Sequence, residues 1–462
     1  MLFSGVTFLY YFLPIVLFLY IVAPKKLKNF VLFVGSLVFY AWGEPKYVFL
    51  MLVSVLIGYL AGILMEKLPK KPVMFVAVAL CLSFLIYFKY TDFFIDNVNA
   101  VLKTQIPALN VIMPIGISFY TFQIISYILD VYFGKVKKQK NYLYLATYIA
   151  MFPQLIAGPI VRYSDINEQL ADRTHSADKL AEGIKRFVVG LAKKVLIANQ
   201  LGELCQIFQN SDEKTVAFYW LYALAASLHI YFDFSGYSDM AIGLGKFFGF
   251  EFPENFNYPY MSKSITEFWR RWHMSLGTWF RDYVYIPLGG NRVGKGKHIF
   301  NILVVWFLTG FWHGAQWNFI LWGLYFAVLL VVEKFWLYKN LEKSKFLSRI
   351  YTLFFILISF VIFNAGSVRE IAVFVKNMFF MGGNAIVGPE YLYYLRSYGW
   401  ILTIAIFGAT CFPKKLYGLC KKNRVVEYIT VVAEPIVLLA LLLLCTAYLV
   451  DGSFNPFLYF RF

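Results

Sequence analysis

The feature that most constrains this sequence is a series of long apolar runs that follow one another along nearly the whole chain. A helix needs about 20 apolar residues, sometimes as few as about 17, to cross the hydrocarbon core of a bilayer. Several of the runs are short, which predicts tilt or partial insertion. The candidate spans are Phe8–Ala23, Phe30–Trp42, Tyr47–Met65, Val73–Tyr90, Met113–Phe133, Tyr142–Ile160, Val216–Phe232, Phe300–Trp312, Phe319–Val332, Ile350–Phe363, Trp400–Phe412 and Ile429–Val450. We predict an all-α polytopic membrane protein with about 11 transmembrane helices.

The composition excludes the other broad classes of protein. Of the 462 residues, 60% are hydrophobic and only 15% are charged, whereas charged residues make up about 25% of a typical soluble domain. A soluble enzyme has too little interior for so many apolar groups, and a disordered chain would have far fewer of them. The net charge of +17 comes from Lys and Arg in short clusters between apolar runs, as in cytoplasmic loops. We therefore expect a lipid bilayer as partner and no nucleic acid.

The lysine clusters of the first half predict an orientation in the membrane. Loops on the cytoplasmic side of a membrane carry an excess of Lys and Arg. Clusters follow the first, third and fifth candidate spans, whereas the loops between them are poor in Lys and Arg. The clusters are Lys25, Lys26 and Lys28, then Lys67, Lys70 and Lys71, then Lys135, Lys137, Lys138 and Lys140. We expect the N-terminus outside and the clusters in the cytoplasm.

Beyond residue 142 the alternation of spans and loops is less regular. The string FPQLIAGP places Pro153, Gly158 and Pro159 in an apolar run, so a re-entrant segment and a span are both open. The charged helix predicted at Ala181–Phe208 suits the membrane interface. From Asp233 to Arg292, charged, aromatic and glycine residues interleave. We expect one membrane-embedded domain over residues 1–462, with its site motifs at 110–335.

His313 is the strongest candidate for chemistry. It lies in TGFWHGAQWNF, between two apolar runs, and an ionisable group at membrane depth points to function. A desolvated imidazole is neutral and can accept a proton from a hydroxyl group. Gly310 and Gly314 allow close approach of another segment or a ligand, and Trp312 can line a dry pocket. The alternative is a core histidine bonded to a helix carbonyl.

A second histidine, His273, lies in SITEFWRRWHMSLGTWFRDY. Continuous helical spacing places Trp269, Trp272, His273, Leu276 and Phe280 on one face and pairs Glu267 with Arg271. This pattern indicates an interfacial amphipathic helix. The histidine is either part of a site or incidental to that helix. By contrast, His175 and His298 lie in polar or basic loops, and we expect both to be solvated.

Other polar residues give weaker signals. Asp233 follows an apolar run, one helical turn after His229, which suggests an ion or proton path, a His–Asp pair or a helix cap. The string GGNRVGKG resembles a phosphate-binding loop, but Gly296 replaces the metal-binding hydroxyl residue and no strand precedes it. The five cysteines, Cys81, Cys205, Cys411, Cys420 and Cys445, form no CxxC motif. We expect no metal site.

Five strings in the chain resemble the membrane-bound O-acyltransferase (MBOAT) family, and above all its bacterial alginate O-acetylation branch. They recur in the family's order over nearly the whole chain, down to the ending NPFLYFRF. The strings are FPQLIAGPIVRY at 152–163, YFDFSGYSDMAIG at 231–243, PENFNYPY at 253–260, FWRRWHMSLGTWFRDYVYIPLGGNR at 268–292 and TGFWHGAQWNF at 309–319.

The resemblance implies a fold, a reaction and roles for individual residues. The helices would surround a central funnel, with His313 as the catalytic histidine and His273 as the second histidine of the bacterial branch. The family moves an acyl group from a cytoplasmic thioester to a hydroxyl group at the outer face. This branch works with an extracytoplasmic SGNH-type acetyltransferase on a polysaccharide. It implies a bacterial plasma membrane and no cofactor besides the donor, acetyl-CoA or an acyl carrier.

Several alternatives stay open on the sequence. His313 acts either as a general base or by carrying the acyl group itself. We expect Asp233, Asn257, Arg270 and Trp312 to bind substrate. A related branch transfers D-alanine to teichoic acid from a carrier protein. Two non-catalytic hypotheses are a transporter, motivated by Asp233, His229 and Lys89, and a scaffold that recruits the extracytoplasmic partner.

Overall fold

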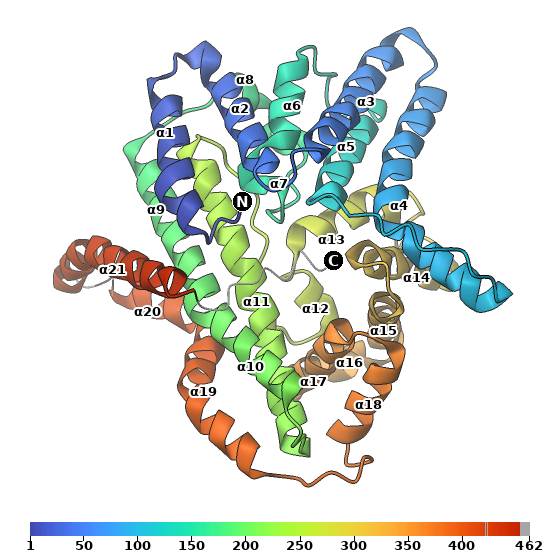
Figure 1. Cartoon of the computed structure of the whole chain (residues 1–462), viewed down its shortest axis with the longest axis vertical. Helices are drawn as coiled ribbons and strands as arrows, with labels where there is room; N and C mark the ends of the chain where they lie inside the picture. The colour runs from blue at the N-terminus through green and yellow to red at the C-terminus, as the bar shows by residue number, and fades with distance from the viewer. Residues whose placement is uncertain (421, 423, 453–462) are drawn as a thin grey trace. The chain divides into compact units, whose positions relative to one another are not determined.

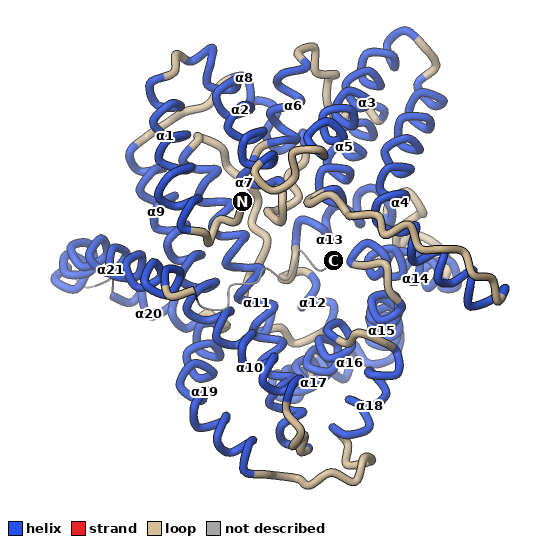
Figure 2. Tube along the Cα trace, in the orientation of Figure 1, coloured by secondary structure: helices blue, strands red, loops and turns tan. Residues whose placement is uncertain are grey.

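The computed structural model describes residues 1–420, 422 and 424–452, and the regular elements of this part are all helices (Figure 2). The chain divides into two compact units. The first comprises Met1–Phe187 and Ser238–Glu254, and the second comprises Val188–Tyr237 and the chain from Asn255 onward. Helices α9 and α11, labelled in Figure 1, each contribute residues to both units.

The first unit holds the N-terminal helices. They are η1 (Phe8–Phe12), α1 (Leu13–Val22), η2 (Lys25–Leu27), α2 (Lys28–Ala41), α3 (Tyr47–Lys67), α4 (Lys70–Leu102), α5 (Ile117–Tyr132), α6 (Tyr142–Ala150), α7 (Phe152–Leu155), α8 (Tyr163–Ala171) and most of α9 (Ala177–Ala192). The long elements coincide with the predicted apolar runs, because a helix satisfies its own backbone hydrogen bonds in a lipid environment.

The second unit contains the remaining elements. They are η3 (Lys193–Ala198), α10 (Asn199–Asn210), most of α11 (Val216–Phe247), η4 (Pro259–Met261), α12 (Ile265–Trp269), α13 (Met274–Phe280), η5 (Arg281–Tyr285), α14 (Lys295–His313), α15 (Trp317–Val332), η6 (Glu333–Leu337), α16 (Tyr338–Leu341), α17 (Lys345–Asn364), α18 (Val368–Met378), α19 (Pro389–Gly408), α20 (Phe412–Cys420) and α21 (Arg424–Val450). The charged stretch at 181–208 is helical, with a π-helical section at η3. Its interfacial location stays a prediction.

Five helical segments of the described residues are long and apolar enough to cross a membrane. Helices α19 and α20, bent by 69°, make a sixth if they are counted as one span. The five are Tyr47–Lys67, Lys70–Leu102, Trp317–Leu341, Lys345–Asn364 and Arg424–Val450. The structure thus supports a helical membrane protein. The predicted number of about 11 transmembrane helices is not confirmed, because several predicted runs form helices too short to span about 30 Å. The central funnel also stays a prediction.

The predicted run Tyr142–Ile160 is not one span, because its helix breaks at Met151 between α6 and α7. Non-helical backbone at membrane depth has to be covered by protein. Here the residues of α7 are fully buried, and the Phe152 N–H donates to Ser36 Oγ of α2 at 3.1 Å. Around Phe152, the rings of Phe8, Phe12 and Phe39 form an aromatic core of the first unit.

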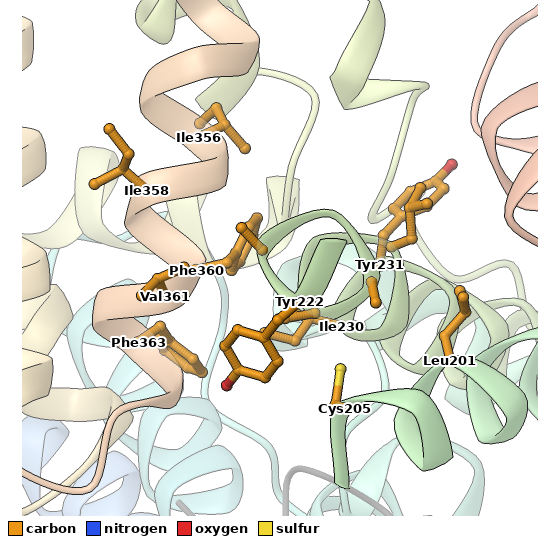
Figure 3. Packing of buried hydrophobic residues seen from close by; sticks show 14 of the residues in the cluster. Leu201, Cys205, Tyr222, Ile230, Tyr231, Ile356, Ile358, Phe360, Val361 and Phe363 are labelled. Atoms are coloured by element: carbon orange, nitrogen blue, oxygen red, sulfur yellow. The ribbon is translucent and has the colours of Figure 1, made fainter. Parts of the chain in front are cut away.

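The core of the second unit is formed by α10, α11, α15 and α17. Figure 3 shows side chains of α10, α11 and α17 converging on this core, among them Tyr222, Ile230, Phe360 and Phe363. At the other extreme, only 6% of the most apolar 18-residue stretch of α21 is buried inside the protein. An apolar helix with most of its surface uncovered suits contact with lipid rather than water.

Candidate active site

His313 is the last residue of α14, and its imidazole is buried. Its Nδ1 lies 2.7 Å from the backbone carbonyl oxygen of Thr309, one turn earlier in the same helix. Because a carbonyl oxygen can only accept a hydrogen bond, Nδ1 carries the proton and Nε2 is the basic nitrogen. The bond predicted for a core histidine is therefore present, and it also fixes the tautomer that a general base requires.

Two glycines bring α14 and α15 into backbone contact next to this histidine. A Cβ atom at Gly310 would overlap the carbonyl oxygen of Phe319, and one at Gly323 would overlap the carbonyl oxygen of Trp306. Residues with side chains therefore cannot occupy these positions without separating the helices. The close approach expected from the glycines of TGFWHG is thus made by α15.

Three aromatic side chains surround the His313 ring. Its centroid lies 5.0 Å from that of Trp312, 5.0 Å from that of Trp322 and 5.6 Å from that of Phe363. They come from α14, α15 and α17, so the surroundings depend on the packing of three helices. Such walls exclude water and strengthen the electrostatic effect of polar groups inside.

The predicted continuous helix around His273 is wrong, because the chain breaks there. Helix α12 ends at Trp269, α13 begins at Met274, and His273 adopts φ 42° and ψ 53° in the left-handed region. The expected shared face of 269, 272, 273, 276 and 280 is therefore not formed. The cause is tertiary: the Met274 N–H donates to the carbonyl oxygen of Asn255 at 2.9 Å, which starts a new helix. The predicted ion pair of Glu267 with Arg271 does form, at 2.6 Å.

Asn255 also contacts the imidazole of His273. Its Oδ1 lies 3.1 Å from His273 Nδ1 and 2.9 Å from the hydroxyl group of Ser275. Because the asparagine oxygen accepts, Nδ1 of His273 carries the proton. His273 Nε2 is buried and has no hydrogen-bond partner among the described residues. A buried acceptor that is left unsatisfied requires an explanation, and a catalytic or binding role is one of the few available.

The two histidines belong to one site. The ring of His273 lies 6.1 Å from that of Trp312 and 4.7 Å, edge to face, from that of Phe234 on α11. Burial, with a smaller electrostatic contribution from His313, lowers the pKa of His273 well below its usual range. Near neutral pH, His273 is therefore a neutral imidazole whose Nε2 accepts hydrogen bonds.

Two positions that contribute to this arrangement are missing from the predicted site residues, Asn255 and Glu333. The Glu333 carboxylate is fully buried and accepts from the N–H groups of Ile265 and Thr266 at 2.7 and 2.8 Å, which stabilises the start of α12. A carboxylate that ends an apolar run was a usable signal. Asn255 lies in the quoted string PENFNYPY, but nothing in one sequence distinguishes it from Asn257.

Asp233 forms an ion pair with a lysine. Its carboxylate lies 2.7 Å from Lys194 Nζ, and both side chains are almost completely buried, with relative exposures of 1% and 2%. Lys194 also donates to Asn199 Oδ1 at 2.9 Å. This ion pair connects α11 to η3, and Asp233 directly precedes Phe234, which contacts His273. The pair of His229 with Asp233 suggested by their spacing stays a prediction.

The other predicted substrate-binding residues are placed as follows. Trp312 lies near both imidazoles, whereas Asn257 and Arg270 are exposed. Asn257 bonds through its backbone to Arg271, with the N–H donating to the Arg271 carbonyl oxygen at 2.9 Å. The structure does not bring the side chains of Asn257 and Arg270 to the two imidazoles.

The two histidines expected to be solvated differ from each other. His175 is exposed, as expected, with its Nε2 3.0 Å from the hydroxyl oxygen of Tyr20. His298 is buried, so the expectation is wrong for it. Tyr285 and Lys334 contact its Nε2 at 2.9 and 3.2 Å. The basic loop expected around His298 is not formed, because α14 already begins at Lys295 and buries His298 in its first turns.

Comparison with known proteins connects this site to a family. The sequence model of the membrane-bound O-acyltransferase family matches residues 135–374, a range that contains His313, His273, Asn255 and the pair of Lys194 with Asp233. The resemblance noted from the five sequence strings is thereby confirmed.

Individual relatives agree with this match. The chain is 38% identical to a probable alginate O-acetylase of Pseudomonas putida over 100% of both proteins. It is 33% identical to a peptidoglycan O-acetyltransferase of Helicobacter pylori, over 83% of this chain and 80% of that protein. It is 34% identical to a teichoic acid D-alanyltransferase of Bacillus subtilis, over 56% and 70%. The chain belongs to the membrane-bound O-acyltransferase family and is a membrane O-acyltransferase.

Proposed function

We propose that this enzyme takes an acetyl group from a cytoplasmic thioester and delivers it to a hydroxyl group at the outer face of a bacterial plasma membrane, for O-acetylation of an extracellular polysaccharide. One observation carries the proposal: His313 and His273 are both buried beside Trp312, and each holds its proton on Nδ1. The names of the alginate and peptidoglycan relatives support acetyl as the group and a polysaccharide as the acceptor.

In the proposed reaction, His313 is the general base. Its Nε2 takes the proton of the acceptor hydroxyl group while that oxygen attacks the thioester carbonyl carbon. The new C–O bond forms, the C–S bond breaks, and the thiolate leaves with the proton that His313 received. The bond from Nδ1 to the Thr309 carbonyl oxygen stabilises the imidazolium formed in between. No cofactor is required besides the thioester itself.

The aromatic walls have a second role in this proposal. A thioester exposed to water near a base is hydrolysed, so an acyltransferase has to exclude water from the reacting atoms. Trp312, Trp322 and Phe363 line the His313 ring with apolar surface. We assign Trp312, which lies next to both imidazoles, to the substrate-binding wall.

The donor and the partner belong to the proposal as well. The donor is a thioester of coenzyme A or of an acyl carrier, and the lysine-rich loops face the cytoplasm from which it comes. An extracytoplasmic SGNH-type acetyltransferase completes transfer to the polymer. The likeness to the D-alanyltransferase of Bacillus subtilis makes D-alanyl transfer to teichoic acid the second candidate. Incubating membranes with acetyl-CoA or with a D-alanylated carrier protein separates the two candidates.

The test is the acetyl-ester content of the secreted polysaccharide in cells that carry variants of the chain. His313→Ala should lower the rate at which acetyl esters are formed by about 10²–10⁴-fold. The comparison requires that the variant protein is as abundant in the membrane as the wild type. His175→Ala is the matched control, because that histidine is exposed and lies outside the site, and it should keep wild-type ester levels. Wild-type ester levels in well-expressed His313→Ala would overturn the proposed role of His313.

A further inference from the structure

A short segment, Asn255 to Asn257, lies alongside the break between α12 and α13. Backbone hydrogen bonds join the two: the Asn257 N–H donates to Arg271, and the Met274 N–H donates to Asn255, each at 2.9 Å. The segment therefore follows the chain on both sides of His273, and Asn255 lies directly opposite the break.

The side chain of Asn255 adds contacts to two residues, His273 and Ser275. Its Oδ1 accepts from His273 Nδ1 at 3.1 Å, from the Ser275 hydroxyl group at 2.9 Å and from the Ser275 N–H at 3.3 Å. Asn255 is 1% exposed and His273 2% exposed, so water does not compete for these bonds. An amide oxygen cannot donate, so this contact permits only the tautomer with hydrogen on Nδ1.

The backbone of His273 gives a second, independent indication. Its φ of 42° lies in the left-handed region, where a residue other than glycine costs about 1–2 kcal/mol. Strain of this kind persists where surrounding contacts fix it, and it is common at functional sites. Here the contacts come from Asn255, and they direct the basic Nε2 of His273 away from the asparagine.

We infer that Asn255 is a positioning residue of this acyltransferase, which holds His273 so that its Nε2 accepts a hydrogen bond from a hydroxyl group of the acceptor. His273 then orients the acceptor while His313 takes the reacting proton. The inference rests on the proposed function, because it assigns the acceptor's side of the same site. It makes His273 a hydrogen-bond acceptor near neutral pH, and so excludes it as a donor to the thioester carbonyl.

The first test measures the tautomer without any need for activity. In purified full-length protein labelled with ¹⁵N-histidine, the signals of His273 are identified by their loss in His273→Ala. Wild type should show hydrogen on Nδ1 of His273. Asn255→Asp, whose carboxylate also accepts, should keep this pattern, and Asn255→Ala should lose it. An unchanged tautomer in a folded Asn255→Ala protein would overturn the inference.

The second test is a double-mutant cycle, measured as acetyl esters on the polysaccharide at equal abundance in the membrane. If Asn255 acts through His273, Asn255→Ala lowers transfer in the wild type and adds no further loss to His273→Ala. If the role of Asn255 is purely structural, the losses of the two single variants multiply in the double variant. Asn301 is the matched control, because it is buried and donates to the carbonyl oxygens of Leu288 and Gly290. The loss of transfer caused by Asn301→Ala should multiply with the loss caused by His273→Ala.

The outcomes separate the two proposals. If His313→Ala retains wild-type transfer, the proposed role of His313 fails, whatever Asn255 does. If His313→Ala abolishes transfer but Asn255→Ala multiplies with His273→Ala, only the positioning role fails. A supporting result is loss in both single variants with no further loss in the double variant.

Discussion

The imidazoles of His313 and His273 are held in different ways, although both carry hydrogen on Nδ1. His313 ends a regular helix and bonds to a carbonyl oxygen four residues earlier, in its own backbone. His273 occupies a helix break with positive φ and bonds to Asn255, 18 residues earlier in the chain. The first arrangement needs only a helix, and the second needs a specific side chain and a tertiary fold.

This difference indicates a division of labour. A backbone carbonyl cannot be removed by mutation, so the tautomer of His313 is protected against every substitution at Thr309 that preserves the helix. The tautomer of His273 depends on the side-chain amide of Asn255, so a single substitution can change it. We expect the proton-transferring residue to have the more robust support and the orienting residue the more specific one.

The largest expected effect compares the two histidines directly. His313→Ala removes the base and should lower transfer by about 10²–10⁴. His273→Ala removes one hydrogen bond to the acceptor, worth about 1.5 kcal/mol, and should lower transfer roughly tenfold. Both losses are measured as the acetyl-ester content of the secreted polysaccharide. A larger loss in His273→Ala than in His313→Ala would reverse the assignment of roles.

The next effect concerns the long-range support of His273 through α11. Removing one partner of the buried pair, with Asp233→Ala or Lys194→Met, should lower the free energy of unfolding by about 3–5 kcal/mol, because a buried charge loses its counterion. The double variant Asp233→Leu with Lys194→Met should recover most of this loss. Thermal unfolding of detergent-purified protein tests this, and single variants as stable as wild type contradict it.

A third prediction disturbs the local support of His313. Gly310→Ala places a methyl group against the backbone of α15, and overpacking of this kind costs about 1–3 kcal/mol. Transfer should fall as well, because Gly310 is one turn from His313. The control is Gly296→Ala in the first turn of the same helix, where a Cβ meets open space. Equal melting temperatures for the two variants would show that the helix crossing tolerates a side chain.

The fourth prediction isolates the backbone strain at residue 273. Both His273→Gly and His273→Ala lose the imidazole, but only glycine adopts positive φ without a penalty. His273→Gly should therefore be more stable than His273→Ala by about 1 kcal/mol, with the same low transfer. Denaturant unfolding of the two variants side by side gives the difference. Greater stability of His273→Ala would mean that the left-handed conformation relaxes once the side chain is gone.

The smallest expected effect is that of Thr309→Val. The variant keeps the backbone carbonyl oxygen that binds His313 and loses only the hydroxyl group, which bonds to the carbonyl oxygen of Val305 at 2.7 Å. Transfer should fall much less than in Asn255→Ala, measured in the same cells. Comparable losses would remove the distinction between backbone and side-chain support.

The sequence predicted the helical class and the setting of His313 because both depend on local patterns. Apolar runs form helices in lipid, and a histidine between Trp312 and Gly314 lies at a helix end that packs on its neighbour. The close approach at Gly310 was predicted for the same reason. The number of spans was less predictable, because an apolar run such as 142–160 can break at a single residue and bury its break against another helix.

What sequence reasoning missed depends on contacts between distant residues. The helix break at His273 contradicts local spacing, since Asn255 supplies the hydrogen bonds that restart the helix. Asn255 and Asn257 are two residues apart in one string, and only the fold shows which one points toward the histidine. The pairing of Asp233 with Lys194 was missed for the same reason, because a lysine 39 residues earlier in the chain has no sequence signature as a partner.

The contact of α14 with α15 at Gly310 and Gly323 has a consequence for how molecules enter. With no side chain between the two backbones, there is no free space between these helices for one to shift toward the other. Room next to His313 is therefore expected to open by rotation of the indole groups that surround it. The indole rings of Trp312 and Trp322 would then control access to the imidazole of His313.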